Sequence, residues 1–384
     1  MKNRTRQWYS LPVRREIEEA RALWEEIFPE DSAEFLDYYE QWKSSHNWIQ
    51  TRHAGGKLVS MIHWNPYRVQ AGSEIWESYY LVAVATRPEY RHRGLMRGQL
   101  REGIELCRAE GVPFVFLMPA DPEIYRPFGF HYFYDRRKRE IADPWHQSWV
   151  GSEKVDIRPI RQDEIGEAAD FLDRELSRRF AMYPLRDEEY LRRTSAECQS
   201  EEGDLEGIFS EGRLIGVLSC WGVDPIEIRE LILAEGWEIG EGRDCVEAAM
   251  CKKWQSAGKI QMITTSEEDM SEPIMMGRIT NLEAFLSPVT ASEPVELQLR
   301  VTDPLIPENA GDFLWRVTEE GSQMIREQQF FNLPDLEIGI EDLFSWLTGY
   351  RALSDVENAK IPAEGEAKIA KVRPFCGTFF TEVV

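Results

Sequence analysis

The sequence lacks the residue patterns that commonly mark a metal, disulfide or nucleotide site. Its six cysteines include no CxxC pair, and its six histidines include no HxxxH pair. No loop has the Walker or the dinucleotide-binding glycine spacing. No apolar run reaches the roughly 18 residues of a membrane-spanning helix, and the first residues show no apolar stretch typical of a secretory signal. We therefore expect no metal, no membrane partner and a reducing, cytoplasmic setting.

Positive charge is also scarce. The chain of 384 residues holds 45 Lys and Arg against 68 Asp and Glu, which gives a net charge of −23. Such a surface repels nucleic acid and anionic membranes, and it favours a small cationic substrate. Hydrophobic residues make up 42% of the chain and aromatic residues 11%, so a large core is available. At roughly 150 residues per domain, the length predicts two or three domains.

Residues 81–97 stand out from this acidic background. An apolar run with strand character ends near Pro88, and three basic residues then precede Gly94. Beyond the glycine, apolar residues recur at helical spacing, at Met96, Leu100, Ile104 and Cys107. A strand, a basic glycine-containing loop and a helix start can grip a phosphate, because the first N–H groups of a helix have no internal partner. A surface turn with solvated charges would give the same short pattern.

A second stretch follows after one helix and one strand. Residues 114–118 form an apolar run suited to a buried strand. Asp121 and Pro122 suit the cap and the first residue of a helix, and Tyr125 lies on that helix ahead of Phe128-Gly129-Phe130. Taken alone, Tyr125 has the properties of a packing residue. The two stretches together, in this order, favour a functional site.

The rest of the chain divides into further units. Two amphipathic helices and two strands precede the basic stretch, and a second unit follows residue 145. Residues 212–221 echo residues 56–64, so we expect the second unit to repeat the first fold. Acidic Glu235 and Glu241 stand where its basic loop would be, and they would repel a phosphate. The last part of the chain indicates a small α+β domain, with alternating strands and a helix at 295–301, 313–317 and 338–350.

The two stretches resemble the coenzyme A motifs of the GCN5-related N-acetyltransferases (GNAT). The whole order is similar to the Eis-type (enhanced intracellular survival) N-acetyltransferases. The residues that carry this resemblance are Val84-Ala85-Thr86, Arg91 to Arg97, Ile124 to Phe130, Met276 to Ile279, Glu341 to Phe344 and Leu347 to Arg351. The resemblance implies a mixed α/β (α+β) fold class, with tandem GNAT folds followed by a small sterol-carrier-protein-like α+β domain. The implied units are a catalytic GNAT domain at 1–145, a degenerate, non-catalytic GNAT-like domain at 146–282 and the sterol-carrier-like domain at 283–384.

The resemblance also implies an activity and a site. It implies transfer of acetyl from acetyl-CoA to a primary amine of an aminoglycoside-like polyamine, by a homo-oligomer that is a hexamer. The backbone of Val84, Ala85 and Thr86 would pair with the pantetheine and present an oxyanion-binding N–H, and Tyr125 would be the general acid. The remaining implied coenzyme contacts are Arg91, His92, Arg93, Gly94, Leu95, Met96 and Arg97 around the diphosphate and Ala120 and Asp121 along the pantetheine.

The resemblance assigns the general base to the carboxylate of the last residue, Val384. An apolar tail suits burial, and a buried carboxylate can take a proton from an ammonium. Glu382 is the nearby alternative, and a frayed chain end without a role is the other interpretation. We expect the amine to attack the thioester directly, because no cysteine has an activating neighbour in the sequence.

Two further hypotheses stay open. A lysine or peptide amine, or a simple polyamine, would fit the same fold and the same acidic charge as an acceptor. A protein of another class would use the sterol-carrier-like domain to bind an apolar ligand, with the GNAT parts as a scaffold. The arginine loop and Tyr125 argue against a scaffold, which would not require either of them.

Overall fold

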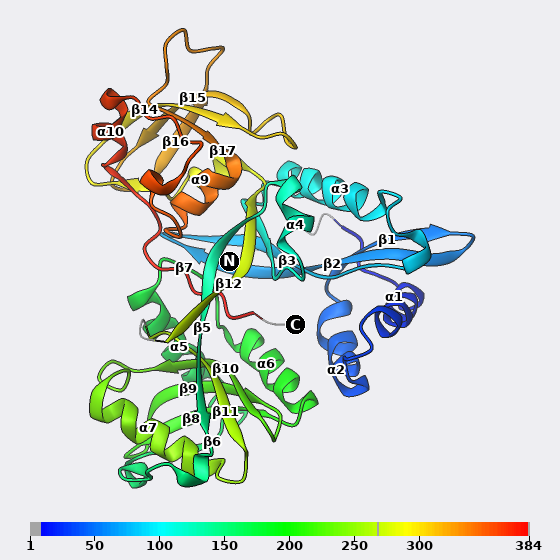
Figure 1. Cartoon of the computed structure of the whole chain (residues 1–384), viewed down its shortest axis with the longest axis vertical. Coiled ribbons are helices and arrows are strands. Elements are labelled where there is room, and N and C mark those ends of the chain that lie inside the picture. Colours follow the sequence, from blue (N-terminus) through cyan, green and yellow to red (C-terminus); the bar gives the residue numbers. More distant parts are fainter. Residues whose placement is uncertain (1–8, 267–268, 383–384) are drawn as a thin grey trace.

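The computed structural model describes residues 9–266 and 269–382. One mixed sheet of 12 strands runs through two α/β units, and a separate domain with a sheet of 4 strands follows them. Figure 1 shows the first unit on the right, the middle unit below it and the C-terminal domain at the top. The strands of the large sheet run in the order β1-β2-β3-β4-β12-β5-β11-β10-β9-β8-β6, and β7 pairs with β2.

The first unit contains the elements that the sequence predicts, with longer strands. The apolar run at residues 58–64 is the first half of one long strand, and the run at 81–85 is the end of another, which lies next to it. The helical spacing of Phe35 to Trp42 continues past an α-helix into a π-helical turn. The elements are α1 (Arg14–Ile27), α2 (Ala33–Tyr39), η1 (Glu40–Ser44), β1 (Trp48–Ala54), β2 (Lys57–Ala71), β3 (Glu74–Thr86), η2 (Pro88–Tyr90), α3 (Leu95–Ala109), β4 (Phe114–Leu117), α4 (Pro122–Tyr125), η3 (Arg126–Phe128) and β5 (His131–Ala142).

Strand alternation gives this half of the sheet two buried faces. On β2, Met61 and Tyr67 belong to the apolar cluster that includes α1 and α2, whereas Ile62 and Trp64 belong to the cluster that includes α3. Figure 1 shows α3 on one side of these strands and α1 and α2 on the other. The two faces of this sheet can therefore border different parts of one site. The site described below uses both faces.

The middle unit repeats this arrangement. Its hairpin of β8 and β9 turns at Gly212, with φ +76°, as the hairpin of β1 and β2 turns at Gly56, with φ +77°. A parallel pair of strands, β10 and β11, then follows, as β3 and β4 do in the first unit. The elements are η4 (Pro144–His146), η5 (Ser152–Lys154), β6 (Asp156–Pro159), α5 (Ile165–Arg179), β7 (Met182–Pro184), α6 (Glu188–Ser200), β8 (Asp204–Ser210), β9 (Arg213–Trp221), β10 (Ile226–Leu233), α7 (Gly240–Lys253), β11 (Lys259–Thr264) and β12 (Met270–Ile279).

The two units exchange strands at the centre of the sheet. The order β4-β12-β5-β11 places β12, from the end of the middle unit, against β4 of the first unit. In return, β5 of the first unit pairs with β11 of the middle unit. Figure 1 shows both long strands crossing from one unit into the other. Because each unit contributes a strand next to the strands of the other, the two units share one continuous sheet.

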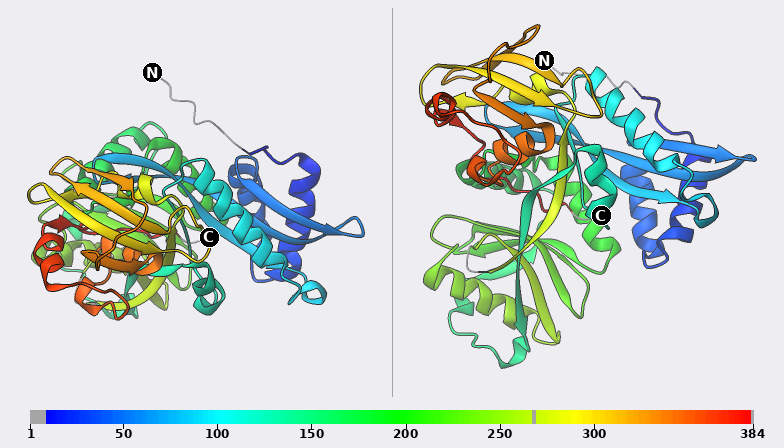
Figure 2. Two further views of the ribbon diagram at one scale, coloured as in Figure 1. Left: turned by 90° about the horizontal axis from the view of Figure 1, so that it is seen from above. Right: turned by 45° about the horizontal axis from the view of Figure 1, so that its top comes forward.

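The C-terminal domain has the alternating strands and the helix that the sequence predicts. Val295 faces Val317 in the antiparallel pair of β14 and β15, and β14 also pairs in parallel with β17. In Figure 2 this domain lies beside the first unit, at the far end of the molecule from β6 and β8. The elements are α8 (Leu282–Leu286), β13 (Thr290–Ala291), β14 (Val295–Thr302), β15 (Gly311–Val317), β16 (Ser322–Arg326), β17 (Leu336–Gly339), α9 (Ile340–Leu347), η6 (Leu353–Asp355), α10 (Ala363–Ile369) and β18 (Val372–Arg373).

The segment after β18, residues 374–382, leaves the C-terminal domain and runs between the two units. We call it the tail. Its backbone pairs with β7, where Phe379 N–H donates to Met182 O at 2.9 Å. The Phe380 side chain is fully buried and packs edge to face on Phe116 and Phe133, with ring centroids 5.2 and 4.8 Å apart.

Among the described residues, no helix has the length and apolar character needed to span a bilayer.

Candidate active site

The site begins where two parallel strands of the first unit separate. β3 and β4 pair from Tyr79 opposite Val115 to Leu81 opposite Leu117. Beyond Leu81, β3 continues alongside β2 as far as Thr86, with a register shift next to Ala83, whose φ is +48°. A bulge of this kind bends a strand away from its neighbour. The backbone of Val84, Ala85 and Thr86 therefore borders the opening between β3 and β4.

The basic loop lies at the end of this strand and leads into α3. Gly94 has φ +78° and caps the helix, so the turn requires a residue that tolerates the left-handed region. Arg91 Nε donates to Thr86 O at 3.0 Å, and an Arg93 Nη donates to Glu89 O at 2.8 Å. Both arginines and Arg97 are exposed. Their charges add to the free N–H groups of the helix start, and the arrangement suits a diphosphate.

Arg87, which stands just before the loop in the sequence, is not part of the loop. Arg87 is only 5% exposed, and its Nε donates to Leu58 O at 2.8 Å. Its guanidinium forms an ion pair with Glu26 of α1. Its side chain points away from the loop, because the end of β3 turns it toward α1. Arg87 fastens α1 to the sheet.

Tyr125 lies on the α3 side of the opening. Asp121 caps the short helix α4 by accepting from Glu123 N–H at 3.0 Å, as the sequence predicts. Tyr125 is 6% exposed, and burial raises the pKa of its phenol to about 12. It belongs to the same apolar cluster as Val84 and Met96. The two predicted motifs therefore meet in space, and the tyrosine keeps its proton at neutral pH, as a proton donor must.

The residues present fit a diphosphate-bearing thioester such as acetyl-CoA. The helix start and the arginines would hold the diphosphate, and the loop at Gly94 is exposed, so a ligand can reach its N–H groups. Ala120 and Asp121 are exposed in the connection between β4 and α4, next to the opening, where a pantetheine arm would pass. No group of three or more metal-ligating side chains occurs among the described residues.

The opposite face of the opening carries the tail and a cleft. Tyr80 stacks on Phe116, with ring centroids 5.1 Å apart, and its hydroxyl donates to Glu382 O at 3.4 Å. A cleft of about 480 Å³ lies beside them, between η1, β2 and β3 of the first unit and α6 of the middle unit. Its lining includes Trp42, Lys43, Tyr67, Glu77, Asp187, Glu189, Tyr190 and Arg193. Val384, the predicted base, lies outside the described residues.

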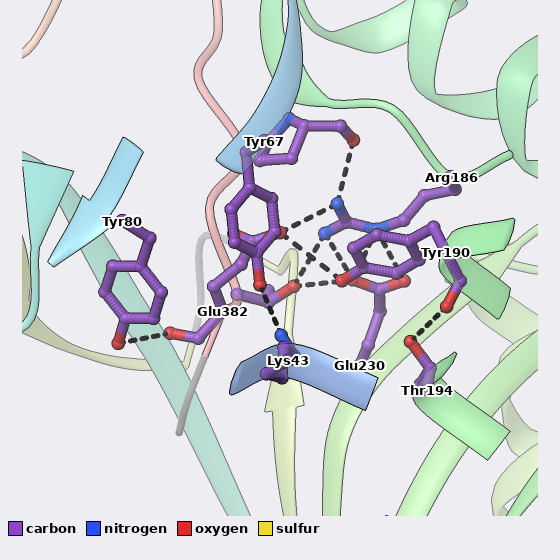
Figure 3. A network of polar contacts seen from close by, with 10 residues as sticks. Lys43, Tyr67, Tyr80, Arg186, Tyr190, Thr194, Glu230 and Glu382 are labelled. Atoms are coloured by element: carbon purple, nitrogen blue, oxygen red, sulfur yellow. Dashed lines mark hydrogen bonds and ion pairs between the residues drawn. The ribbon is translucent and has the colours of Figure 1, made fainter. Parts of the chain in front are cut away.

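Sequence reasoning missed the polar network behind this cleft. Lys43 is buried, and its Nζ donates to the Tyr67 hydroxyl at 3.2 Å. Burial lowers the pKa of Lys43 to about 7, and the nearby Arg193 contributes in the same direction. Arg186 and Glu230 of the middle unit join the network and bind the tail (Figure 3). These residues are far apart in the chain and lie in no motif, and they meet only because the middle unit and the tail pack against the first unit.

The middle unit keeps the strand geometry but not the basic loop. β10 and β11 pair only from Ile226 to Ile228, and β10 shifts register beside Arg229, as β3 does in the first unit. The helix that follows, α7, begins at Gly240 with Glu241 in its first turn. Glu241 forms an ion pair with Lys154 at 2.6 Å. An acidic helix start opposes phosphate binding, in agreement with the sequence interpretation of this loop.

Comparison with known families and structures agrees with this geometry. Residues 11–133 match the model of the acetyltransferase (GNAT) domain, and residues 282–372 match the model of the sterol carrier protein domain. The chain thus joins a GNAT acetyltransferase domain, a domain type that uses acetyl-CoA, to a sterol-carrier-like domain, and it is an acyltransferase. A comparison with curated protein sequences found no match.

Three solved structures resemble the chain over nearly its whole length. A conserved protein from Enterococcus faecalis V583, described as a probable N-acyltransferase, is 19% identical with a TM-score of 0.76, covering 96% of this chain and 98% of its own. A GCN5-related N-acetyltransferase from Anabaena variabilis is 15% identical, with a TM-score of 0.79 and coverages of 98% and 99%. Eis1 from Mycobacterium abscessus is 15% identical, with a TM-score of 0.66 and coverages of 97% and 99%. At these identities the likeness establishes the fold and not the substrate.

Proposed function

We propose that the chain transfers an acetyl group from acetyl-CoA to a primary amine of a small cationic, aminoglycoside-like polyamine. The observation that carries the proposal is the meeting of three features at one opening. These are the separated strands β3 and β4, the arginine loop at the start of α3, and the buried Tyr125. A surface turn with solvated charges, or a tyrosine that only packs, would not require the other two features nearby.

Different residues around the opening bind different parts of the coenzyme. The backbone groups of Val84, Ala85 and Thr86 pair with the pantetheine arm, and one N–H there stabilises negative charge on the thioester oxygen. Residues 91–97 hold the diphosphate through helix N–H groups and charge-assisted bonds. Bound acetyl-CoA supplies an acyl thioester, whose carbonyl carbon accepts a neutral amine. Ala120 and Asp121 lie along the arm on the β4 side.

Proton transfers complete the reaction. The amine nitrogen forms the new bond to the acetyl carbon, and the carbon–sulfur bond breaks. Tyr125 gives its proton to the departing sulfur, which is consistent with a phenol that burial keeps protonated. The proton lost by the amine passes to a carboxylate, which we assign to the end of the chain at Val384. Glu382 is two residues away and is the alternative base, because its buried carboxyl group has a raised pKa.

The cleft supports a cationic acceptor with several polar groups. Glu77 and Glu189 contribute carboxylates to its lining, and Trp42 and Tyr67 contribute aromatic faces. Asp187 is ion-paired with Arg68 at 3.1 Å, and Lys43 and Arg193 add positive charge at the α6 and η1 side. Aromatic faces and carboxylates both attract ammonium groups. The net charge of −23 acts in the same direction over the whole surface. A lysine side chain in a peptide, or a linear polyamine, satisfies part of the same chemistry and is the second candidate acceptor.

We further propose that the chain assembles as a hexamer, which light scattering of the purified protein tests.

The test measures release of free coenzyme A thiol from acetyl-CoA with three sets of amines. They are polyamino sugars, linear polyamines and lysine-containing peptides, with the mass of each product recorded. Turnover highest with a polyamino sugar, and a product heavier by one or more acetyl groups, supports the proposal. Turnover restricted to peptides would replace the acceptor class. A chain extended by one residue beyond Val384 moves the terminal carboxylate, and unchanged turnover in that variant would overturn its assignment as the base.

A further inference from the structure

Arg186 is a fully buried arginine between the middle unit and the tail. It lies on the short segment between β7 and α6, and its side chain has no exposed surface. A guanidinium has five N–H donors, and here each one has an acceptor. The acceptors are both Glu230 carboxylate oxygens at 2.8 and 3.2 Å, Pro184 O at 2.8 Å, Glu382 Oε1 at 2.8 Å and Thr381 Oγ1 at 3.1 Å. Figure 3 shows the guanidinium at the centre of the network.

The tail contributes as much to this network as the middle unit does. The Thr381 hydroxyl donates to Glu230 at 2.5 Å, and the Tyr190 hydroxyl donates to Glu382 Oε1 at 3.3 Å. The guanidinium also lies over the Tyr190 ring, 4.4 Å from its centroid. Two consecutive tail residues are therefore bound through their side chains to one arginine and to its partners.

The composition of the network suits the fixing of a position better than the gain of stability. One guanidinium faces two buried carboxylates, and burial raises the pKa of Glu382. Glu382 Oε2 has no hydrogen-bond partner among the described residues. Apolar side chains in place of a buried ion pair are often as stable or more stable, because charges lose their hydration on burial. Buried ion pairs do, however, select one geometry, because their bonds are directional.

The tail residues that Arg186 holds lie at the side of the site that receives the amine. The Glu382 carbonyl accepts from Tyr80, and Tyr80 stands one residue before the point where β3 and β4 separate. We propose that Arg186 is a positioning residue for acyl transfer. It holds Thr381 and Glu382, the last described residues of the tail, at the face of the opening that receives the amine. This inference rests on the proposed function, in which the carboxylate at the chain end is the base.

Four variants test the role of Arg186. Arg186→Met removes all its bonds, and Arg186→Lys keeps the charge with fewer donors. Arg243→Met is the matched control, since Arg243 is a largely buried arginine of the middle unit whose ion pairs, with Glu247 at 2.9 Å and Asp269 at 3.4 Å, do not involve the tail. Tyr80→Phe removes the hydrogen bond to the Glu382 carbonyl. For each variant we would measure kcat, the KM of both substrates, acetyl-CoA affinity, and hydrogen exchange of the tail amides.

The expected result separates positioning from folding. Arg186→Met should lower kcat about tenfold or more while acetyl-CoA affinity changes less than about twofold, a loss confined to the transition state. Arg186→Lys should fall between this variant and the wild type, and Arg243→Met should match the wild type. In the double variant with Tyr80→Phe, the loss should be smaller than the product of the single losses, because both residues act through Glu382. Tail amides should exchange faster in Arg186→Met alone among the arginine-to-methionine variants.

Three outcomes would overturn the inference. The first is an Arg186→Met enzyme with wild-type kcat. The second is a parallel loss of kcat and acetyl-CoA affinity, and the third is losses that multiply with Tyr80→Phe. Should Arg186→Met fail to fold, Arg186→Lys and its exchange pattern decide the question. If the wild-type chain acetylates no amine, the proposed function itself fails and the catalytic part of the inference falls with it. Hydrogen exchange then still decides whether Arg186 holds the tail.

Discussion

Arg278 of β12 forms an ion pair with Asp303 of the C-terminal domain, in which Nη2 donates to both carboxylate oxygens at 2.8 and 2.7 Å, and neither side chain has exposed surface. The same guanidinium donates to Phe128 O, in the segment that follows Tyr125. A Cβ at Gly129 would lie 2.1 Å from its Nη1, so the glycine makes room for this contact. The pair therefore connects three parts of the molecule, namely the exchanged strand, the segment after Tyr125 and the C-terminal domain.

Removing one partner of this pair should destabilise the whole chain. Asp303→Asn leaves the Arg278 charge buried without a carboxylate, which costs about 3–5 kcal/mol when a buried pair is broken. Chemical denaturation, followed by tryptophan fluorescence, measures the loss. Glu296→Gln is the control, because its ion pair with Arg316 is 53% exposed on both sides and should be worth about 1 kcal/mol or less. Equal losses in the two variants would contradict the structural role given to Arg278.

The arginine loop should act on the diphosphate and on no other part of the donor. Arg91→Ala combined with Arg93→Ala should raise the KM for acetyl-CoA about tenfold or more, because each arginine loses a charge-assisted contact. With S-acetylpantetheine, which has no diphosphate, the same variant should behave as the wild type does. Arg101→Ala, an exposed arginine further along α3, is the control. An equal effect on both donors would place the diphosphate elsewhere.

His63 should make the fold sensitive to acid. It lies on β2 against Trp24, with ring centroids 5.3 Å apart, and neither ring nitrogen has a hydrogen-bond partner among the described residues. Burial lowers its pKa from 6.5 to about 3. The unfolded chain therefore binds a proton on this histidine before the folded chain does. Its contribution to stability is complete above pH 6.5 and is lost as the pH falls from there toward 3.

His63→Phe removes this titration and keeps a ring of similar shape. Its free energy of unfolding should fall less than that of the wild type between pH 7 and pH 4, because one proton-binding difference is gone. At pH 7 the variant should be as stable as the wild type or slightly more so, since a buried polar ring without partners is replaced by an apolar one. Parallel pH profiles for the two proteins would show that His63 is solvated or paired.

The local features of the site follow from the sequence, and its long-range features do not. The loop at Gly94, the helix capped by Asp121 and the position of Tyr125 depend on neighbours within a few residues, and those expectations are confirmed. The exchange of β5 and β12 depends on pairings between distant residues, such as Met276 with Leu117, which no local periodicity encodes. For the same reason, the inward turn of Arg87 could not be read from the cluster of arginines around it.

The network around Arg186 illustrates the same limit. Nothing in the sequence near Arg186 predicts a buried guanidinium, because its partners Glu230 and Glu382 are 44 and 196 residues away along the chain. The tail itself was predictable as an apolar segment fit for burial. Where it lies, however, depends on three units meeting. Sequence patterns of this kind therefore predict the coenzyme side of the site better than the acceptor side.

The most direct test of the account compares Tyr125→Phe with the wild type in acetyl transfer to the best amine of the panel. Tyr132→Phe, at a partly buried tyrosine beside the same apolar cluster, serves as the control. The account predicts that Tyr125→Phe lowers kcat about 100-fold while acetyl-CoA affinity and thermal stability stay close to wild type, since only a proton donor is lost. The control should keep its kcat. Wild-type kcat in Tyr125→Phe would contradict the central claim that this opening carries the chemistry.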